Sequence, residues 1–276
     1  MERKYGLIGH PVSHSLSPQM HAAAYQSLHL DATYEAMDVP PVQLKAMLHK
    51  VRAGNIDGLN VTLPHKVAVL PYLDELDEDA HAIGAVNTIV RCGHRLIGKN
   101  TDGTGYMTAL LAHVDARKLA CANVLVIGAG GAARAIVYAL CKHGVGYVTV
   151  ANRTLTRAQQ LVAHFPQWPV KAAPLLQVEE DLSPYDVLIQ TTSVGMTPHV
   201  REIPLSLETL AQHTFVSEII YHPIETALIK TAKARGNKTS PGIGMFVEQA
   251  ALSIYYWTQR WPDRVPMTET VLKLTK

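Results

Sequence analysis

A lysine stands where a helix is expected to begin in NVTLPHK, residues 60–66. Pro64 favours the first turn of a helix, so Lys66 would lie at the positive end of the helix dipole. The dipole disfavours the ammonium form there, which suits a lysine that gives up and regains a proton. Asp102 in KNTDGTGY is a candidate acid to hold it. On spacing alone, a solvated lysine and a helix-capping aspartate remain the simpler interpretation.

Two serines precede a second predicted helix in HSLSPQMHAAAYQ, residues 14–26. We expect Ser17 to be the N-cap of that helix and Pro18 its first residue. The hydroxyls of Ser15 and Ser17, beside the free N–H groups of a helix start, would suit a small carboxylate. One capping serine and one loop serine explain the same residues equally well.

A glycine-rich turn follows an apolar strand in VLVIGAGGAARAIVYAL, residues 124–140. Gly128 permits the tight turn, Gly130 lets the backbone approach a pyrophosphate, and Ala133 lets the helix lie close to the strand. The pattern, with its strand and its helix both present, predicts a dinucleotide site. A tight strand-to-helix turn that binds nothing is the alternative.

The residues after the next strand indicate which dinucleotide would bind. NAD sites usually carry an acid there, whereas this chain has Asn152, Arg153, Thr154 and Arg157. Two guanidinium groups and a hydroxyl suit a 2′-phosphate through charge-assisted hydrogen bonds, which favours NADP. The alternative is that both arginines lie on a solvated helix start.

The composition is that of an ordinary globular chain. The 276 residues are 47% hydrophobic and 17% charged, with a net charge of +2. No run of Lys and Arg provides the basic surface that a nucleic-acid binder needs. The most apolar window, residues 122–141, contains Asn123, Arg134 and a glycine-rich turn, so it predicts a buried strand and helix rather than a membrane span. The first fifteen residues lack the apolar core of a signal peptide.

Cysteines and histidines provide no metal or disulfide pattern. Cys92, Cys121 and Cys141 are widely separated, and the fourteen histidines lack the spacing of metal ligands. We therefore expect no metal, and a cytoplasmic location.

Strand and helix patterns alternate along the chain and would position these residues. Strands are expected at 4–9, 33–39, 56–63, 123–127, 147–153, 185–192 and 214–220. Helices are expected at 17–30, 41–54, 101–114, from residue 131 to the Gly144 region, and at 245–261. The alternation predicts an α/β fold with largely parallel sheets, divided into two domains near the helix at 101–114.

Taken together, these stretches resemble the shikimate dehydrogenase family. The motifs that carry the resemblance occur in the order of the family: SHSLSP, NVTLPHK, IGAVNT, NTDGTG, GAGGAARA, ANRT, TTSVGM, YHP and PGIGMFVEQA. They extend over nearly the whole chain. The resemblance implies the reversible, NADP-dependent reduction of 3-dehydroshikimate to shikimate in the pathway to aromatic amino acids.

The resemblance also implies an arrangement of domains. An N-terminal α/β domain, residues 1–104, would bind the substrate and would be completed by the C-terminal helix within residues 245–276. Residues 105–244 would form a Rossmann-type, NADP-binding domain with a parallel sheet. A monomer or a homodimer is expected.

Site residues follow from the motif matches. Lys66 and Asp102 match the family's catalytic pair, in which the lysine delivers a proton to the carbonyl oxygen. Ser15 and Ser17 match the residues that hold the substrate carboxylate. The residues that match the lining around the ring and its hydroxyls are Thr62, Asn87, Asp102, Tyr221 and Gln249. The residues that match the NADP clamp are Gly128, Ala129, Gly130, Gly131, Ala132, Asn152, Arg153, Thr154 and Arg157. Ile219 and Gly242 match positions near the nicotinamide.

Three residues depart from the family pattern. Glu218 stands where Asp is usual, His222 replaces an Asn, and Pro241 replaces an Asp or Asn. They bear on cofactor affinity and substrate preference more than on reaction type. Ser17 and the Asn-Arg-Thr stretch favour shikimate and NADP, while relaxed use of quinate or NAD stays open.

A rival hypothesis of another class is a regulatory protein that binds NADP without turnover, because a fold alone does not establish activity. Such a sensor would not need Lys66, Asp102 or the two serines. Their presence favours the enzyme.

Overall fold

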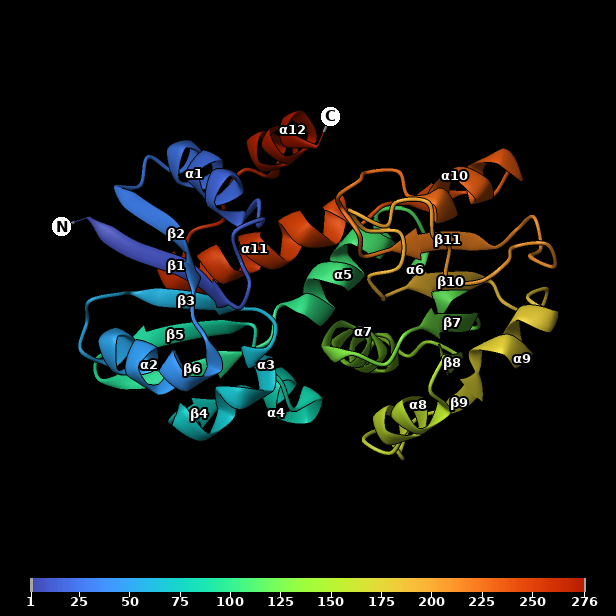
Figure 1. Cartoon of the computed structure of the whole chain (residues 1–276), viewed down its shortest axis with the longest axis horizontal. Helices are drawn as coiled ribbons and strands as arrows, with labels where there is room; N and C mark the ends of the chain where they lie inside the picture. Colours follow the sequence, from blue (N-terminus) through green and yellow to red (C-terminus); the bar gives the residue numbers. More distant parts are fainter. Residues whose placement is uncertain (1, 276) are drawn as a thin grey trace. The chain divides into compact units, whose positions relative to one another are not determined.

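The computed structural model describes residues 2–275, and the chain divides into two compact units (Figure 1). Unit 1 contains the residues up to Asp102 together with Val247–Leu274. Unit 2 contains Gly103–Phe246. Each unit has its own sheet and its own hydrophobic core, so each is described by itself.

Among the described residues, unit 1 is built on a six-stranded sheet with the order β2-β1-β3-β5-β6-β4. Its strands are β1 (Arg3–Gly9), β2 (Ala32–Asp38), β3 (Gly58–Val61), β4 (Glu75–Leu76), β5 (Thr88–Cys92) and β6 (Arg95–Lys99). β1 pairs in parallel with β2 and β3, as does β4 with β6, whereas β5 pairs antiparallel with β3 and β6. The sheet is thus mainly parallel, as expected, with an antiparallel hairpin that the sequence patterns missed.

Helices lie between successive strands of unit 1, and the first two provide the long crossovers that parallel strands need. They are α1 (Ser17–Ser27), α2 (Leu44–Arg52), α3 (His65–Ala68) and α4 (Glu78–Ile83). Leu44, Leu48 and Val51 lie on one face of α2 and pack with Leu59 and Ile89 of the sheet in a common core. The apolar spacing of α2 therefore fixes how it lies on the sheet.

The C-terminal helices α11 (Ile243–Thr258) and α12 (Arg264–Leu274) complete unit 1 from residue 247 onward. The indole Nε1 of Trp257 donates a hydrogen bond of 3.0 Å to the carbonyl of Ile89. The same indole stacks on Tyr5 with 4.7 Å between ring centroids. A Cβ at Gly58 would lie 2.4 Å from the indole nitrogen, so only glycine admits this contact. The apolar pattern at 245–261 correctly predicted a helix that packs back on another element.

Unit 2 is built on a six-stranded sheet with the order β12-β11-β10-β7-β8-β9, and its pairings are parallel. Its strands are β7 (Asn123–Ile127), β8 (Tyr147–Asn152), β9 (Val170–Pro174), β10 (Val187–Gln190), β11 (Phe215–Glu218) and β12 (Thr239–Ser240). Counted within the unit, the order is 3-2-1-4-5-6, the order of the Rossmann fold. The predicted Rossmann-type fold is confirmed.

The helices of unit 2 lie between its strands in the chain. They are α5 (Asp102–Leu111, in this unit from Gly103), α6 (Ala116–Leu119), α7 (Gly131–Lys142), α8 (Leu155–Val162), α9 (Leu175–Glu180) and α10 (Ala227–Ala234). Leu125, Leu188 and Val216, from three adjacent strands, share one core with Leu228 and Ile229 of α10. Parallel strands that are covered on both faces have continuous apolar runs, and NVLVI and VLIQ show that pattern.

In the part of the chain that the structure describes, no helix is long and apolar enough to cross a membrane.

Candidate active site

Lys66 and Asp102 form an ion pair in unit 1. β3 ends at Val61, and the single turn of α3 begins at His65, so Lys66 lies in a first helical turn, as the sequence predicts. Asp102 is the first residue of α5. Their side chains are 17% and 8% exposed, so the pair is shielded while the lysine keeps some access to solvent. The contact favours the paired interpretation over a solvated lysine.

Asn87 holds the other side of the aspartate. Its Nδ2 donates to Asp102 Oδ1 at 2.9 Å and to Thr101 Oγ1 at 2.8 Å. Its Oδ1 accepts from the backbone N–H of Thr101 at 2.8 Å. Both oxygens of Asp102 are therefore engaged, one with Lys66 and one with Asn87, and the carboxylate has a fixed orientation.

The two serines also lie together, but the expected cap is wrong. α1 begins at Ser17, its N-cap is Leu16, and Leu16 provides no side-chain capping bond. Instead Ser15 Oγ accepts from the Ser17 backbone N–H at 3.2 Å and donates to Ser17 Oγ at 3.0 Å. Ser17 is instead the first residue of the helix, and Pro18 is the second. Proline is tolerated at either position of the first turn, so the sequence allows both arrangements. The result is a pair of adjacent hydroxyls at a helix start.

Two further predicted substrate residues lie in unit 1. Thr62 directly follows β3, and its N–H donates to the carbonyl of Ile8 at 2.9 Å. Gln249 lies on α11, where its carbonyl accepts from Ser253 Oγ at 2.9 Å. Tyr221, by contrast, belongs to unit 2. There its ring stacks on Phe246 with centroids 4.0 Å apart, and burial raises the pKa of its hydroxyl.

The glycine turn of unit 2 lies at the point where the strand order reverses. Gly128 follows β7 with φ +110°, a conformation that favours glycine. A Cβ there would lie 2.6 Å from Oγ1 of Thr191, which follows the adjacent strand β10. In open parallel sheets, ligands bind outside the carboxyl ends of the strands at such a switch point.

The next glycines leave the room that a dinucleotide needs. A Cβ built on Gly130 or Gly131 has no neighbour within 4 Å, so the backbone at the start of α7 faces open space. Ala129 and Ala132 flank this turn and are half-buried, while Ala133 is fully buried against the strand. Exposed N–H groups at the start of a twelve-residue helix favour a bound phosphate, so these residues fit the predicted cofactor.

The predicted NADP-selective residues occupy the end of β8 and the start of α8. Asn152 Nδ2 donates to the carbonyl of Thr154 at 2.8 Å, which shapes the turn between strand and helix. Thr154 is the N-cap of α8, without a side-chain capping bond. Arg153 and Arg157 are exposed, and within residues 2–275 neither forms an ion pair. Both guanidinium groups are available to an anion.

Ile219 and Gly242 touch through their backbones. A Cβ on Gly242 would lie 2.2 Å from the carbonyl carbon and oxygen of Ile219, so only glycine fits. Gly242 N–H also donates to the carbonyl of Ile220 at 2.9 Å. The two residues predicted near the nicotinamide, 23 positions apart, are thus brought together.

The three residues that depart from the family pattern are in unlike surroundings. Glu218 ends β11 and is 1% exposed, and burial raises the pKa of its carboxyl to about 7, partly offset by a hydrogen bond. That bond comes from Thr226, the N-cap of α10, whose Oγ1 lies 2.9 Å from both carboxyl oxygens. His222 is exposed and Pro241 is half-buried. Glu218 is therefore a buried residue that joins the two ends of the 219–225 loop through Thr226, and it does not lie on the surface of that loop.

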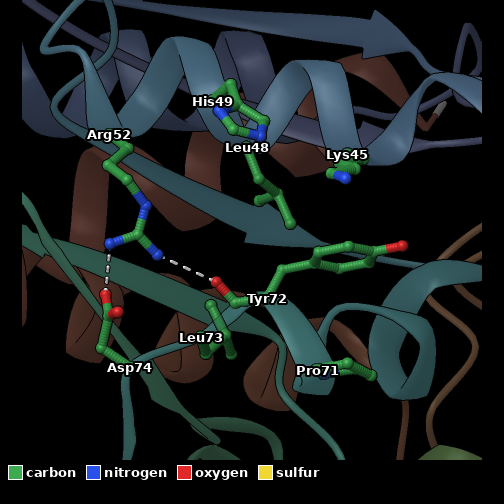
Figure 2. A pocket seen from close by; sticks show the side chains of 8 residues that line it. All are labelled: Lys45, Leu48, His49, Arg52, Pro71, Tyr72, Leu73 and Asp74. Atoms are coloured by element: carbon green, nitrogen blue, oxygen red, sulfur yellow. Dashed lines mark hydrogen bonds and ion pairs between the residues drawn. The ribbon is translucent and has the colours of Figure 1, made fainter.

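A separate hollow of about 280 Å³ lies between α2 and the segment after α3 (Figure 2). Arg52 bridges it, donating to Asp74 Oδ2 at 2.7 Å and to the carbonyl of Tyr72 at 3.1 Å. The residues that line it are Lys45, Leu48, His49, Arg52, Pro71, Tyr72, Leu73 and Asp74. None of them is a predicted site residue. Among the described residues, no group of three or more His, Cys, Asp or Glu side chains could hold a metal ion.

Sequence reasoning missed several buried polar residues behind Asn87. Asn60 and Thr88 are direct partners in the pairing of β3 with β5, and both are buried. Polar residues inside otherwise apolar strands were the available signal.

A chain whose one unit has a Rossmann-ordered sheet with an open glycine turn, and whose other unit holds a shielded lysine–carboxylate pair, is typical of the nicotinamide-dependent dehydrogenases. Three family models match the chain in succession. They are the shikimate dehydrogenase substrate binding domain over residues 7–89, shikimate / quinate 5-dehydrogenase over 110–202, and the shikimate 5'-dehydrogenase C-terminal domain over 242–272. The chain belongs to the shikimate dehydrogenase family.

Individual relatives resemble the chain over nearly its whole length. The shikimate dehydrogenase (NADP(+)) of Shouchella clausii is 52% identical and covers 98% of each chain. The crystal structure of shikimate 5-dehydrogenase from Thermus thermophilus with NADP(H) and shikimate has a TM-score of 0.88 at 38% identity, covering 98% of this chain and 99% of that one. Quinate dehydrogenase from Corynebacterium glutamicum, in complex with NAD, has a TM-score of 0.90 at 31% identity, covering 99% and 100%.

Proposed function

We propose that this chain catalyses the reversible NADP-dependent reduction of 3-dehydroshikimate to shikimate, a step toward aromatic amino acids. The observation that carries the chemistry is the shielded contact between Lys66 and Asp102. The close relative from Shouchella clausii bears the name of this activity. Within the chain, unit 1 would bind the substrate and unit 2 the cofactor.

Lys66 and Asp102 act as a proton-transfer pair in this proposal. NADPH, when bound, supplies the hydride that reaches the carbonyl carbon. Lys66, as ammonium, donates a proton to the carbonyl oxygen, and it accepts that proton in the reverse direction. Asp102 orients the ammonium group, and Asn87 orients Asp102 through Nδ2. The partial exposure of Lys66 lets it regain its proton from water.

The substrate carboxylate would lie at the start of α1, on the adjacent hydroxyls of Ser15 and Ser17. A carboxylate there gains hydrogen bonds and a favourable helix dipole. Thr62, Asn87 and Gln249, with Tyr221 from unit 2, would contact the ring and its hydroxyls. This division gives the carboxylate and the reacting carbonyl separate sets of donors, which fixes the orientation of the ring.

The cofactor would be held by residues of unit 2. The open backbone around Gly130 and Gly131 suits its pyrophosphate. Asn152, Arg153, Thr154 and Arg157 would hold the 2′-phosphate. The two arginines are exposed and form no ion pair with any residue that the structure describes, which supports that role. Ile219 and Gly242 would border the nicotinamide. Because their backbones touch and Gly242 has no side chain, the two residues can present a flat surface, which would suit a planar ring.

The test crosses two substrates with two cofactors. The initial rate of nicotinamide reduction is measured with purified protein for shikimate and quinate, each with NADP and with NAD. We expect the shikimate–NADP pair to give the highest kcat/KM. Absence of turnover in every pairing would refute the enzyme and favour an NADP-binding regulatory protein.

A quinate dehydrogenase with relaxed cofactor use is the second candidate. It is favoured by the similarity to a quinate dehydrogenase solved with NAD and by Glu218, His222 and Pro241. The same four rates separate the two candidates, because a quinate–NAD rate equal to the shikimate–NADP rate contradicts the first. Arg153 and Arg157 weigh against it, since NAD offers them no phosphate.

We also propose a cytoplasmic location, because Cys92, Cys121 and Cys141 are all free thiols, the usual state in a reducing compartment. A monomer or homodimer stays our expectation for the assembly, which light scattering after gel filtration measures directly.

A further inference from the structure

Four polar side chains lie buried behind Asn87, although none of them belongs to the proposed catalytic pair. Asn60 of β3, Thr88 of β5, Thr101 and Ser253 of α11 are each no more than 7% exposed. Polar groups are buried at a cost unless they are hydrogen-bonded. Where their hydrogen bonds go is therefore informative.

Asn60 connects three of the elements. Its Nδ2 lies 3.0 Å from Ser253 Oγ, 3.1 Å from Thr88 Oγ1 and 3.2 Å from the carbonyl of Asn87. Ser253 in turn lies 2.8 Å from Thr88 Oγ1. The cluster joins two sheet strands to a helix that enters unit 1 nearly 200 residues later in the chain.

The orientation of Asn60 is fixed by Tyr34, whose hydroxyl donates to Asn60 Oδ1 at 2.8 Å. Burial raises the pKa of Tyr34 well above its ordinary value, and a hydrogen bond with the Ser17 side chain partly offsets this. Tyr34 thus stays neutral and keeps the proton it donates. Tyr34 therefore holds the amide of Asn60 in one orientation within the cluster.

The other end of the cluster fixes Asn87. A backbone N–H can only donate, so the bond from Thr101 N–H identifies the oxygen of the Asn87 amide. Thr88 Oγ1 donates a second hydrogen bond of 3.0 Å to that oxygen. Because the oxygen is held on this side, the Nδ2 group must face Asp102. Thr88 therefore acts on the orientation of Asp102 through one intervening side chain.

We propose that Asn60, Thr88 and Ser253 form a polar brace whose function is to hold Asn87, and through it Asp102, in the orientation that meets Lys66. The three are positioning residues, since each acts through Asn87. This inference rests on the proposed function, because it assigns the brace a role in proton transfer by Lys66. It also gives α11 a task in catalysis, because Ser253 supplies one corner of the brace.

The test compares Thr88→Val, which removes the hydroxyl and keeps the shape, with Thr88→Ser, which keeps the hydroxyl. Thr258→Val is the matched control. Thr258 lies in α11, the helix that carries Ser253. Among the described residues, its hydroxyl bonds to the carbonyl of Ile254 at 2.7 Å and to the backbone of Arg260, outside the brace. For each variant, kcat and KM for shikimate, the pH dependence of kcat, the Kd for NADP and the melting temperature are measured.

We expect Thr88→Val to lower kcat about tenfold or more, with KM for shikimate and Kd for NADP changed less than about threefold. The shape of its pH–rate profile should also change, because the carboxylate that contacts Lys66 is no longer held in one orientation. Thr88→Ser should restore both, and Thr258→Val should match the parent protein. A merely structural role would lower the melting temperature and leave the pH profile alone.

If Thr88→Val does not fold, Ser253→Ala carries the test with the same expected pattern. A folded Thr88→Val with the kcat and pH profile of Thr258→Val overturns the brace and leaves the proposed function intact. A parent protein without shikimate-dependent turnover overturns the proposed function, and the catalytic role of the brace with it.

Discussion

The two units present their functional groups in opposite ways. In unit 1 the proposed chemistry depends on side chains that are shielded and mutually bonded, from Asn60 through Thr88 and Asn87 to the pair of Asp102 and Lys66. In unit 2 the proposed cofactor site depends on bare backbone at Gly130 and Gly131 and on exposed arginines. One region is already filled by its own partners, and the other is left open.

The difference follows from what each region would have to do. Proton transfer needs a few atoms held within tenths of an ångström, and a network of satisfied hydrogen bonds provides that. Binding a polyanion needs N–H groups and cations without competing partners. Substitutions in unit 1 should therefore affect turnover, whereas those in unit 2 should affect cofactor affinity. The following changes test that distinction, from the largest effect to the smallest.

Lys66→Ala should have the largest effect. Without the proton donor, kcat should fall about 10²- to 10⁴-fold, while the Kd for NADP stays within about twofold because the clamp is in the other unit. Steady-state kinetics and cofactor titration by fluorescence measure the two quantities. Comparable turnover in the variant would remove Lys66 from the mechanism, and a large change in Kd would contradict the division between the units.

Arg153→Gln should reduce the preference for NADP over NAD by about 10- to 100-fold in kcat/KM. The change removes a charge-assisted bond to a 2′-phosphate and leaves NAD without a loss. The matched control is Arg201→Gln, an exposed arginine of the same unit outside the clamp. An unchanged ratio would support the solvated-helix interpretation of Arg153.

Gly130→Ala should raise the KM for NADP about tenfold without destabilising the protein. The new methyl group meets nothing within 4 Å in the protein itself, so a rise in KM would come from space that the bound cofactor needs. Gly242→Ala is the contrasting variant, because its methyl would lie 2.2 Å from the Ile219 backbone and should lower the melting temperature. Equal melting temperatures for the two variants would contradict this contrast.

Glu218→Gln should change stability with pH and have the least effect on turnover. Because burial raises the folded pKa of Glu218 to about 7 from 4.5, the folded protein binds the proton more tightly than the unfolded chain. The carboxyl therefore contributes stability below about pH 4.5 that is lost as the pH rises to about 7, up to roughly 3 kcal/mol. The variant, which cannot ionise, should lose less stability than the parent between pH 5 and pH 8 in denaturant titrations. Parallel losses would show that Glu218 is not the titrating group.

Much of this architecture could be predicted from local pattern. The buried parallel strands of unit 2 are continuous apolar runs. The glycine spacing that begins at Gly128 is also a local signal, because the positive φ of that residue favours glycine. β4 and β12, at two residues each, are too short to have a period. The β5–β6 hairpin was missed because its strands, TIVRC and RLIGK, mix charged and apolar residues.

The site was predictable only in part, for a related reason. Lys66 and Asp102 were suggested by types and positions, but their contact joins residues 36 apart, and spacing could not decide between pairing and solvation. Ser253 and Asn60 are 193 positions apart, so no local rule connects them. Their bond depends on how α11 packs on the sheet, which is a tertiary event. The cap at Leu16 shows the same limit at short range, since one residue of shift changed the role of Ser17.

The way unit 1 is assembled from both ends of the chain has a consequence for its synthesis. Unit 2 is nearly continuous, so its residues leave the ribosome together, whereas unit 1 waits for Val247–Leu274. At about 5–20 residues per second, the first hundred residues spend roughly 10–30 s without α11. That helix supplies the hydrogen-bond partners of Asn60 and of the Ile89 carbonyl, which are Ser253 and Trp257. During that interval the nascent chain exposes polar side chains, such as Asn60 and Thr88, that are buried in the folded protein. A chaperone that binds incompletely folded sheets should therefore bind unit 1 during synthesis more than unit 2, although most of unit 1 is made first.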